Sequence, residues 1–378
     1  MKVSRTVLKT SLDWKLYRLS LTIFDTYPIW GYPLLVSLSE LICCHEFILF
    51  IQYLLVLISL YILLREFNPK KFVEKIIFYG CILFYVMVMS TKWPDAILAS
   101  CLFFFAYFHN KQKFLIATIL LGVAYNFRTE ALIFLLVYMM YIILNKKKFI
   151  VTLSLIMIMP WIILQYQNHQ VFLPTTTNAG GVLYISLGQL PNNKWNRTHI
   201  DEDAYEFIKQ KTDAKINYPW GYKANILLKK QFVEDVKKHP IEFIKKLIYN
   251  TYKLIIGGVY TTELSNYFVK KDEQEKISKF YKSNLTVFLN DIFSLKKEAI
   301  GKFISFSLKL FSIIFLLFVL LHTFLYILNR HIKLSNILLW IILLQMLITI
   351  FIQYQPRHIS HIIILFILLR TPYTFLKK

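Results

Sequence analysis

The stretch FISFSLKLFSIIFLLFVLLHTFLYIL (303–328) contains one formally charged residue, Lys309, and is otherwise almost wholly apolar. A helix of about 20 mainly apolar residues is long enough to cross the hydrocarbon core of a bilayer. Blocks of the same kind recur at 47–64, 149–164 and 334–352. We therefore expect an all-α polytopic membrane protein, because a helix satisfies its backbone hydrogen bonds within its own segment even in lipid.

The overall composition agrees with this expectation. Of the 378 residues, 56% are hydrophobic, and the mean hydropathy is +0.49. The net charge of +22 arises from 44 Lys and Arg against 22 Asp and Glu. In a soluble domain this excess would suggest a nucleic-acid partner. Here the cations concentrate in short connections between apolar blocks, so we expect membrane lipids as partners and no nucleic acid.

The distribution of cations predicts the topology. Cytoplasmic connections carry an excess of Lys and Arg, and basic and non-basic connections alternate along this chain. We therefore expect a multi-pass protein of a bacterial inner (cell) membrane, with its large loop extracytoplasmic. The side on which residues 1–30 lie stays open. The connections expected in the cytoplasm are 65–75, 109–113, 145–148, 329–333 and the C-terminus.

Four regions follow from this pattern. We expect an external-loop remnant with an interfacial helix at 1–45, and a transmembrane helix bundle at 46–166. An extracytoplasmic domain, mixed but mostly helical, is expected at 167–301, and C-terminal transmembrane helices at 302–378.

The long external region begins with a stretch that is typical of a strand, QVFLPTTTNAGGVLYISLGQLP (170–191). Helices are expected at 201–211, where acidic residues suit a helix N-terminus, and at 221–238, which is amphipathic. A third helix is expected from Pro240, a residue favoured in a first helical turn. Its mixture of apolar, aromatic and Lys residues is typical of a helix on a membrane surface.

Three outward-facing connections carry ionisable residues, which are costly near a membrane and often functional. YNFRTE (125–130) contributes Arg128 and Glu130, and TKWPD (91–95) contributes Lys92 and Asp95. The third, YQPRHISH (354–361), contributes Arg357, with His358 beside it.

Arginine forms paired hydrogen bonds to phosphate oxygens, so Arg128, Lys92 and Arg357 are the expected phosphate-binding residues, with Asp95, Glu130 and His358 in support. A structural alternative stays open for some of them. Asp95 could complement the helix dipole after Pro94, and Thr129 could cap the next helix. The four cysteines and the histidines lack convincing metal-ligand spacing, so we expect no metal and no cofactor.

Three segments carry a resemblance to a known family: YPIWGYPLLVSLS (27–39), WPDAILASCLFFFAYFHNKQKFLIATILLGVAYNFRTEALIF (93–134) and FVEDVKKHPIEFIKKLIYNTYKLI (232–255). Together they resemble the membrane-embedded GT-C glycosyltransferases. The similar branch contains the dolichyl-phosphate-mannose protein mannosyltransferases and the bacterial lipid A aminoarabinose transferases. The resemblance implies a GT-C-like helix bundle.

The resemblance also implies an activity. Such enzymes move a sugar from a polyprenyl-phosphate donor to a lipid, glycan or protein acceptor at the outer face of the membrane, with inversion. The family's turn arginine corresponds to Arg128 and its late-span arginine to Arg357, although RHISH lacks the family's Tyr and Pro.

The family's catalytic base is an acidic residue in the first external loop, which places Asp13 first, with Tyr17 four residues on, and Asp25 second. One departure matters here, because no first span precedes GYPLL. We therefore expect either that the start codon lies upstream of Met1, or that the chain is truncated at its N-terminus.

Two other functions stay open. An O-antigen-type polymerase would be expected to carry several arginines in its large loop, whereas 167–300 contains only Arg197. A lipid or ion transporter would be expected to show repeats with paired broken helices, and Pro160 has no evident counterpart.

Overall fold

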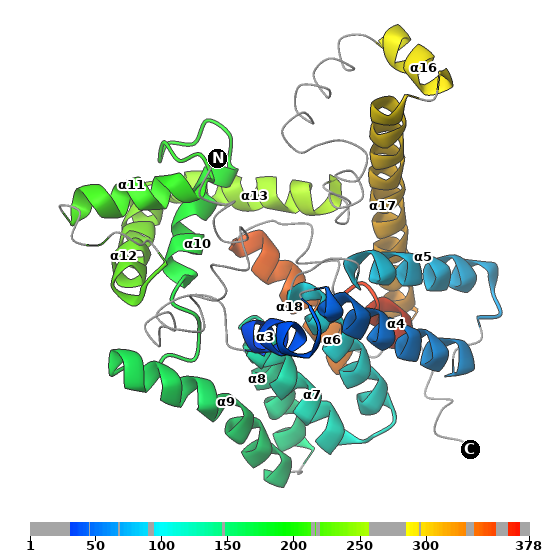
Figure 1. The fold of residues 1–378 in the computed structure, drawn as a ribbon, viewed down its shortest axis with the longest axis horizontal. Coiled ribbons are helices and arrows are strands. Elements are labelled where there is room, and N and C mark those ends of the chain that lie inside the picture. Colours follow the sequence, from blue (N-terminus) through cyan, green and yellow to red (C-terminus); the bar gives the residue numbers. More distant parts are fainter. Residues whose placement is uncertain are drawn as a thin grey trace.

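The computed structural model describes residues 31–44, 46–66, 69–89, 94–145, 148–212, 216, 220–256, 285–294, 296–329, 336–352 and 362–370. Every regular element within these residues is a helix, and none of them forms a strand (Figure 1). Five of the predicted site residues lie outside the described residues, so their roles stay predictions: Asp13, Asp25, Lys92, Arg357 and His358.

The first helices belong to a bundle, and the later ones extend from it. In chain order they are α3 (Gly31–Ile42), α4 (Phe47–Glu66), α5 (Phe72–Met89), α6 (Pro94–Asn110), α7 (Phe114–Phe127), α8 (Ala131–Leu144), α9 (Lys148–His169), α10 (Ala179–Ser186), η2 (Leu187–Gln189), α11 (Asp201–Lys211), α12 (Tyr222–Lys238), α13 (Pro240–Ile256), α16 (Leu285–Phe293), α17 (Lys297–Leu328), α18 (Ile337–Phe351) and α20 (Leu365–Arg370).

The expected apolar blocks all form helices. Two of the described helices are long and apolar enough to cross a membrane, by length and composition: α4 (Phe47–Glu66) and the Lys309–Leu328 part of α17. The other two blocks form α9 and α18. α18 is apolar but shorter, with 15 residues. α7 and α8 are also short apolar helices.

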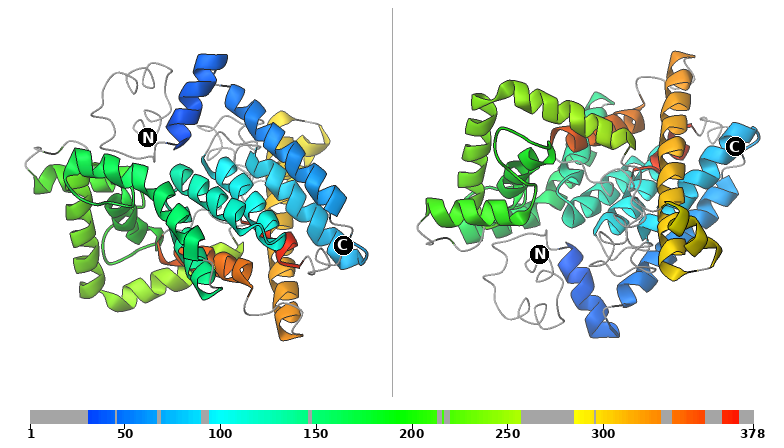
Figure 2. Two further views of the ribbon diagram at one scale, coloured as in Figure 1. Left: turned by 90° about the horizontal axis from the view of Figure 1, so that it is seen from below. Right: turned by 90° about the horizontal axis from the view of Figure 1, so that it is seen from above.

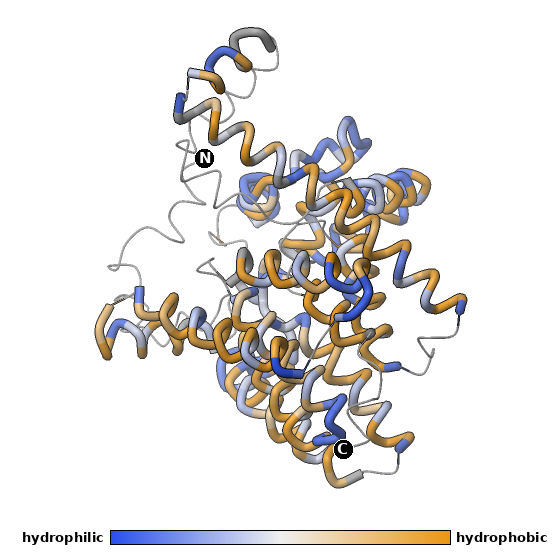
Figure 3. Tube along the Cα trace, turned by 90° about the vertical axis from the view of Figure 1, so that its right-hand side faces the viewer, coloured by the Kyte–Doolittle hydropathy of each residue, from blue (hydrophilic) through white to orange (hydrophobic). Residues whose placement is uncertain are grey.

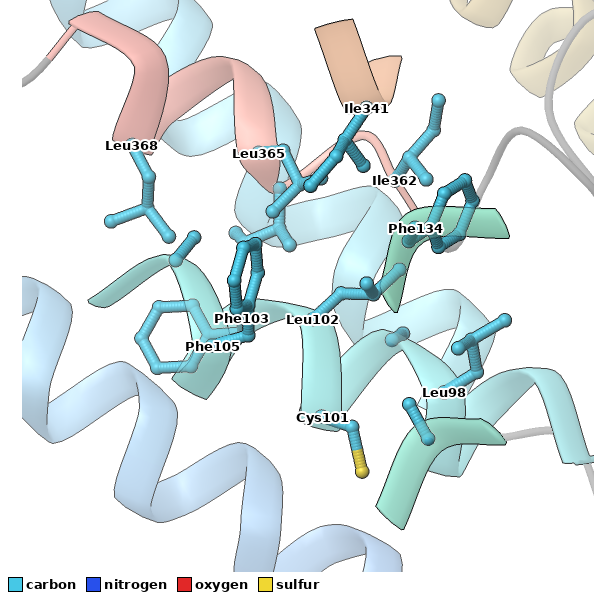
Figure 4. Packing of buried hydrophobic residues seen from close by; sticks show 14 of the residues in the cluster. Leu98, Cys101, Leu102, Phe103, Phe105, Phe134, Ile341, Ile362, Leu365 and Leu368 are labelled. Atoms are coloured by element: carbon cyan, nitrogen blue, oxygen red, sulfur yellow. The ribbon is translucent and has the colours of Figure 1, made fainter. Parts of the chain in front are cut away.

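A single large core joins α3–α9 to parts of α13, α17, α18 and α20. α6 lies at its centre, where side chains such as Leu102 and Phe105 are buried. Figure 4 shows the side chains of α6 together with Phe134 of α8, Ile341 of α18 and Leu365 of α20. Close packing of this kind, rather than exclusion from water, holds helices together in an apolar surrounding.

Polar contacts define the two ends of this bundle. At one end, Lys111 after α6 forms an ion pair of 2.9 Å with Glu66 at the end of α4. Asn110 donates at the same end to the carbonyl of Leu368 on α20, at 3.2 Å. The start of α6 and the end of α7 meet at the opposite end, through Asp95 and Arg128. The basic connection 109–113 therefore lies away from the predicted site, as the cation pattern requires.

The long region after α9 forms a second group of helices, α10–α13, with two small cores of its own. Figure 3 shows that hydrophilic residues are frequent in this part of the chain, whereas hydrophobic residues dominate the bundle. α11 and α12 begin and end within about one residue of their expected bounds, and α13 begins at Pro240. The helix that starts at Pro240 is thus confirmed.

The expectation of a strand within 170–191 is wrong, because residues 179–189 form α10 and η2. Their packing gives the reason. A Cβ atom on Gly180 would lie 2.2 Å from the carbonyl oxygen of Asn225, so only glycine allows α10 to approach α12 this closely. The Asn225 side chain also accepts a hydrogen bond of 2.6 Å from the Gly180 amide. Contact with α12, rather than local propensity, determines this helix.

Candidate functional site

Arg128 lies at the mouth of the bundle, between two helices. α7 ends at Phe127, and Arg128 follows it in an extended conformation, with φ −147° and ψ 125°. Its amide donates to the carbonyl of Ala124 at 2.9 Å, which closes the last turn of α7. Because the backbone is extended here, the Arg128 side chain does not lie along the surface of α7. Its guanidinium lies beside the start of α6 instead.

The guanidinium is held by two carboxylates. Its Nη1 donates to Oδ2 of Asp95 at 3.2 Å, and its Nη2 donates to Oε1 of Glu130 at 2.7 Å. The exposed fractions of the three side chains are 11% for Arg128, 2% for Asp95 and 20% for Glu130. The structure thus brings together three residues that the sequence had placed on two separate connections.

Each carboxylate is placed by its helix. Asp95 follows Pro94 in the first turn of α6, where a carboxylate is favoured by the helix dipole. Glu130 is the last residue before α8, and its side chain makes no capping hydrogen bond. The structural alternative in which Thr129 caps α8 does not hold, because Glu130 rather than Thr129 occupies the N-cap position. The Glu130 carboxylate bonds Arg128 instead, since a cation within reach binds it more strongly than a backbone amide.

The charges of this cluster restrict what it can bind. Among the described residues it holds one guanidinium and two carboxylates, both bonded to that guanidinium. A phosphate that binds the Arg128 guanidinium would therefore compete with these carboxylates for it.

The surroundings of the cluster are tightly packed. α3 begins directly against α7, where a Cβ on Gly31 would lie 2.3 Å from the carbonyl oxygen of Asn126. The side-chain Nδ2 of Asn126 donates to the carbonyl of Met157 on α9 at 3.3 Å. From the other side, Tyr125 donates to the carbonyl of Pro174 at 2.8 Å. The residues that flank Arg128 therefore connect α3, α9 and the segment that leads into α10.

A second buried charge was not expected from the sequence. Lys246 on α13 has no exposed surface. Its ammonium donates to the carbonyls of Phe351 and Ile352, both at 2.7 Å, at the C-terminal end of α18. Ser186 Oγ lies 3.4 Å away, and Asn250 donates to the carbonyl of Ile350 at 2.9 Å. Burial lowers the pKa of Lys246 to about 7.

Lys246 thus caps α18, since the last carbonyls of a helix have no partner inside it and attract a cation. A signal for it exists in the sequence. Lys246 lies three residues after Phe243 and four before Asn250, and so on the same face of the helix as these two residues. Its neighbour Lys245 is exposed and forms an ion pair of 3.3 Å with Glu242.

A further ion pair lies within the α10–α13 group. Arg197 joins Asp235 of α12 at 3.0 Å and lies over the ring of Tyr184 on α10. Both charged groups bond to residues of the α10–α13 group. Arg197 is therefore a suitable control for substitutions at Arg128.

No protein family, no curated protein and no solved structure matches this chain.

Proposed function

We propose that this chain is an integral membrane glycosyltransferase. It takes a sugar from a polyprenyl-phosphate donor and transfers it, with inversion, to a lipid, glycan or protein acceptor on the extracytoplasmic side. The observation that carries the proposal is the Arg128 guanidinium, nearly buried at one end of an apolar bundle and bonded to carboxylates from two connections. The resemblance of the three sequence segments supports the same class.

The reaction can be written for these residues. An acceptor hydroxyl or amine attacks the anomeric carbon, and the bond from that carbon to the phosphate oxygen breaks. The phosphate leaves with the electron pair, and a carboxylate accepts the acceptor's proton. In this proposal Asp13 or Asp25 is that carboxylate, and cations neutralise the leaving phosphate.

The role of Arg128 is an exchange of partners. In the resting site Asp95 and Glu130 fix the guanidinium, and an arriving phosphate replaces one of them. Lys92 and Arg357 are proposed to supply additional positive charge for the phosphate. Arginine suits position 128 because its planar guanidinium can hydrogen-bond a carboxylate and a phosphate oxygen at the same time.

Binding of the product carrier tests the proposal without knowledge of the sugar. The full chain in nanodiscs would be titrated with undecaprenyl phosphate and, separately, with undecaprenol. We expect the phosphate to bind more tightly, and Arg128→Lys to weaken it about tenfold or more, given roughly 1.5–3 kcal/mol for a charge-assisted hydrogen bond. Arg197→Lys is the matched control and should leave binding unchanged. Equal affinity for the alcohol and the phosphate would overturn the proposal.

A further inference from the structure

Helix α13 has two unlike faces. One face packs into the protein, where Phe243, Lys246 and Asn250 are buried. Another face carries large apolar residues that remain exposed and follow a spacing of three, four and four residues, which places them on one side of a helix. These residues, which we name the α13 apolar stripe, are Ile241, Ile244, Ile248 and Tyr252.

The direction of α13 restricts what can cover this stripe. α13 contacts both α17 and α18. In Figure 1, and again in the view from above in Figure 2, α13 runs transverse to α17 and ends beside it. The Lys309–Leu328 part of α17 is one of the two candidate membrane spans. A helix that runs transverse to a spanning helix lies along the plane of the bilayer.

The charges next to the stripe are positive. Lys245 on α13 is exposed and Lys253 is half-buried. Two further exposed lysines, Lys237 and Lys238, end α12 just before α13 begins. The acidic residue of the first turn, Glu242, is itself buried and paired with Lys245. Lysines beside an apolar stripe are typical of helices that bind anionic lipid, because the headgroup phosphates attract the ammonium groups.

We propose that α13 is an interfacial helix whose apolar stripe inserts into the adjacent leaflet of an anionic bilayer, with Lys245 and Lys253 at the lipid phosphates. This inference does not depend on glycosyl transfer. It has a structural consequence, because Lys246 and Asn250 fasten the opposite face of α13 to the end of α18. Lipid contact would then fix the position of the α10–α13 group along the membrane normal, relative to the bundle.

Spin labels on single cysteines test the insertion in the full-length protein. The exposed Cys43 and Cys44 are first replaced by serine, whereas Cys81 and Cys101 are buried. A label is then placed by Tyr252→Cys and, as the matched control, by Tyr205→Cys on α11. The two tyrosines are exposed to similar extents, 52% and 44%. Nanodiscs of phosphatidylcholine with phosphatidylglycerol, at about three to one, represent the anionic bilayer.

Relaxation by oxygen, which concentrates in lipid, is compared with relaxation by a water-soluble nickel chelate. We expect position 252 to respond several-fold more to oxygen than to nickel, and position 205 to show the reverse. A label at 252 that responds mainly to nickel would overturn the proposal. A label protected from both reagents would also overturn it, because the stripe would then be covered by protein.

The lysines are tested in the same system. With Lys245→Gln and Lys253→Gln together, the nickel response at position 252 should increase in anionic nanodiscs and change little in pure phosphatidylcholine. Lys209→Gln on α11 is the control. An equal increase in both kinds of nanodisc would contradict the role of lipid charge.

Discussion

The guanidinium of Arg128 and the carboxylate of Asp95 meet at 3.2 Å although the two residues are separated by the whole of α6 and α7. The pair closes one end of this helical hairpin. α6 and α7 also share extensive side-chain packing, so the ion pair determines how the two helix ends are aligned rather than whether the helices associate.

The first prediction concerns the energetic coupling of this pair. Arg128→Met removes the partner of a nearly buried carboxylate and should destabilise the protein by about 3–5 kcal/mol, as expected for a broken buried pair. Asp95→Asn alone should also destabilise it. The double variant should lose less than the sum of the two, because a neutral side chain at position 95 no longer needs the guanidinium, so that only the bond from Glu130 to Arg128 is still lost. Thermal unfolding in detergent measures all three. Strict additivity would show that the pair is not coupled.

The second prediction compares two neighbouring glycines. In Gly180→Ala the new methyl group meets the backbone oxygen of Asn225 at 2.2 Å, whereas in Gly181→Ala it meets the ring of Trp220 at 2.1 Å. The Trp220 side chain is only partly buried and can rotate away, but the α12 backbone cannot. We therefore expect Gly180→Ala to cost roughly 1–3 kcal/mol, as overpacking does, and Gly181→Ala to cost less. Unfolding temperatures measured side by side would decide this order.

The third prediction follows from the buried Lys246. Burial lowers its pKa from 10.5 to about 7, so between these values the unfolded chain binds the proton more tightly than the folded protein does. The free energy of unfolding should therefore increase with pH from about 7 to about 10 through this residue. In Lys246→Met this contribution disappears, whereas in Lys245→Met, the exposed neighbour, it remains. Unfolding temperatures of the three proteins at pH 7 and pH 9 are the measurement. A pH dependence that is unchanged in Lys246→Met would contradict the assignment.

The fourth prediction concerns topology. Lys209 on α11 and Asn145 after α8 are both exposed, and the cation pattern places them on opposite sides of the membrane. In a background without Cys43 and Cys44, Lys209→Cys should react with an impermeant maleimide in intact cells. Asn145→Cys should react only after lysis. The opposite result would invert the proposed orientation, and reaction of both in intact cells would rule out a membrane barrier between them.

Much of the helical framework could be predicted from the sequence, because apolar blocks and helix-start residues act locally. α4 (Phe47–Glu66) covers the apolar block 47–64, and α13 begins at Pro240 as expected. α10 could not be predicted in this way. Its residues are typical of a strand, and the contact of Gly180 with α12 involves a segment far along the chain.

The candidate site was predictable in part for the same reason. The cost of charge near a membrane identified Arg128, Asp95 and Glu130 one by one. Their mutual bonding could not be deduced, since it depends on where α6 starts relative to the end of α7. The alternative in which Thr129 caps α8 does not hold, because α8 begins one residue later than that alternative required and Glu130 occupies the N-cap position. Lys246 was not predicted, because it is adjacent to Lys245 and the sequence alone does not show which of the two lies on the buried face of the helix.

α17 is longer than a membrane crossing requires. It has 32 residues, of which the apolar segment takes the last 20. Residues 297–308 extend the same helix by about 18 Å, at 1.5 Å per residue. In the proposed membrane arrangement, α16, which precedes and contacts α17, is carried clear of the lipid headgroups (Figure 1). An antibody fragment, too bulky to reach an epitope at the bilayer surface, should accordingly bind a tag inserted at Ser294 in intact cells.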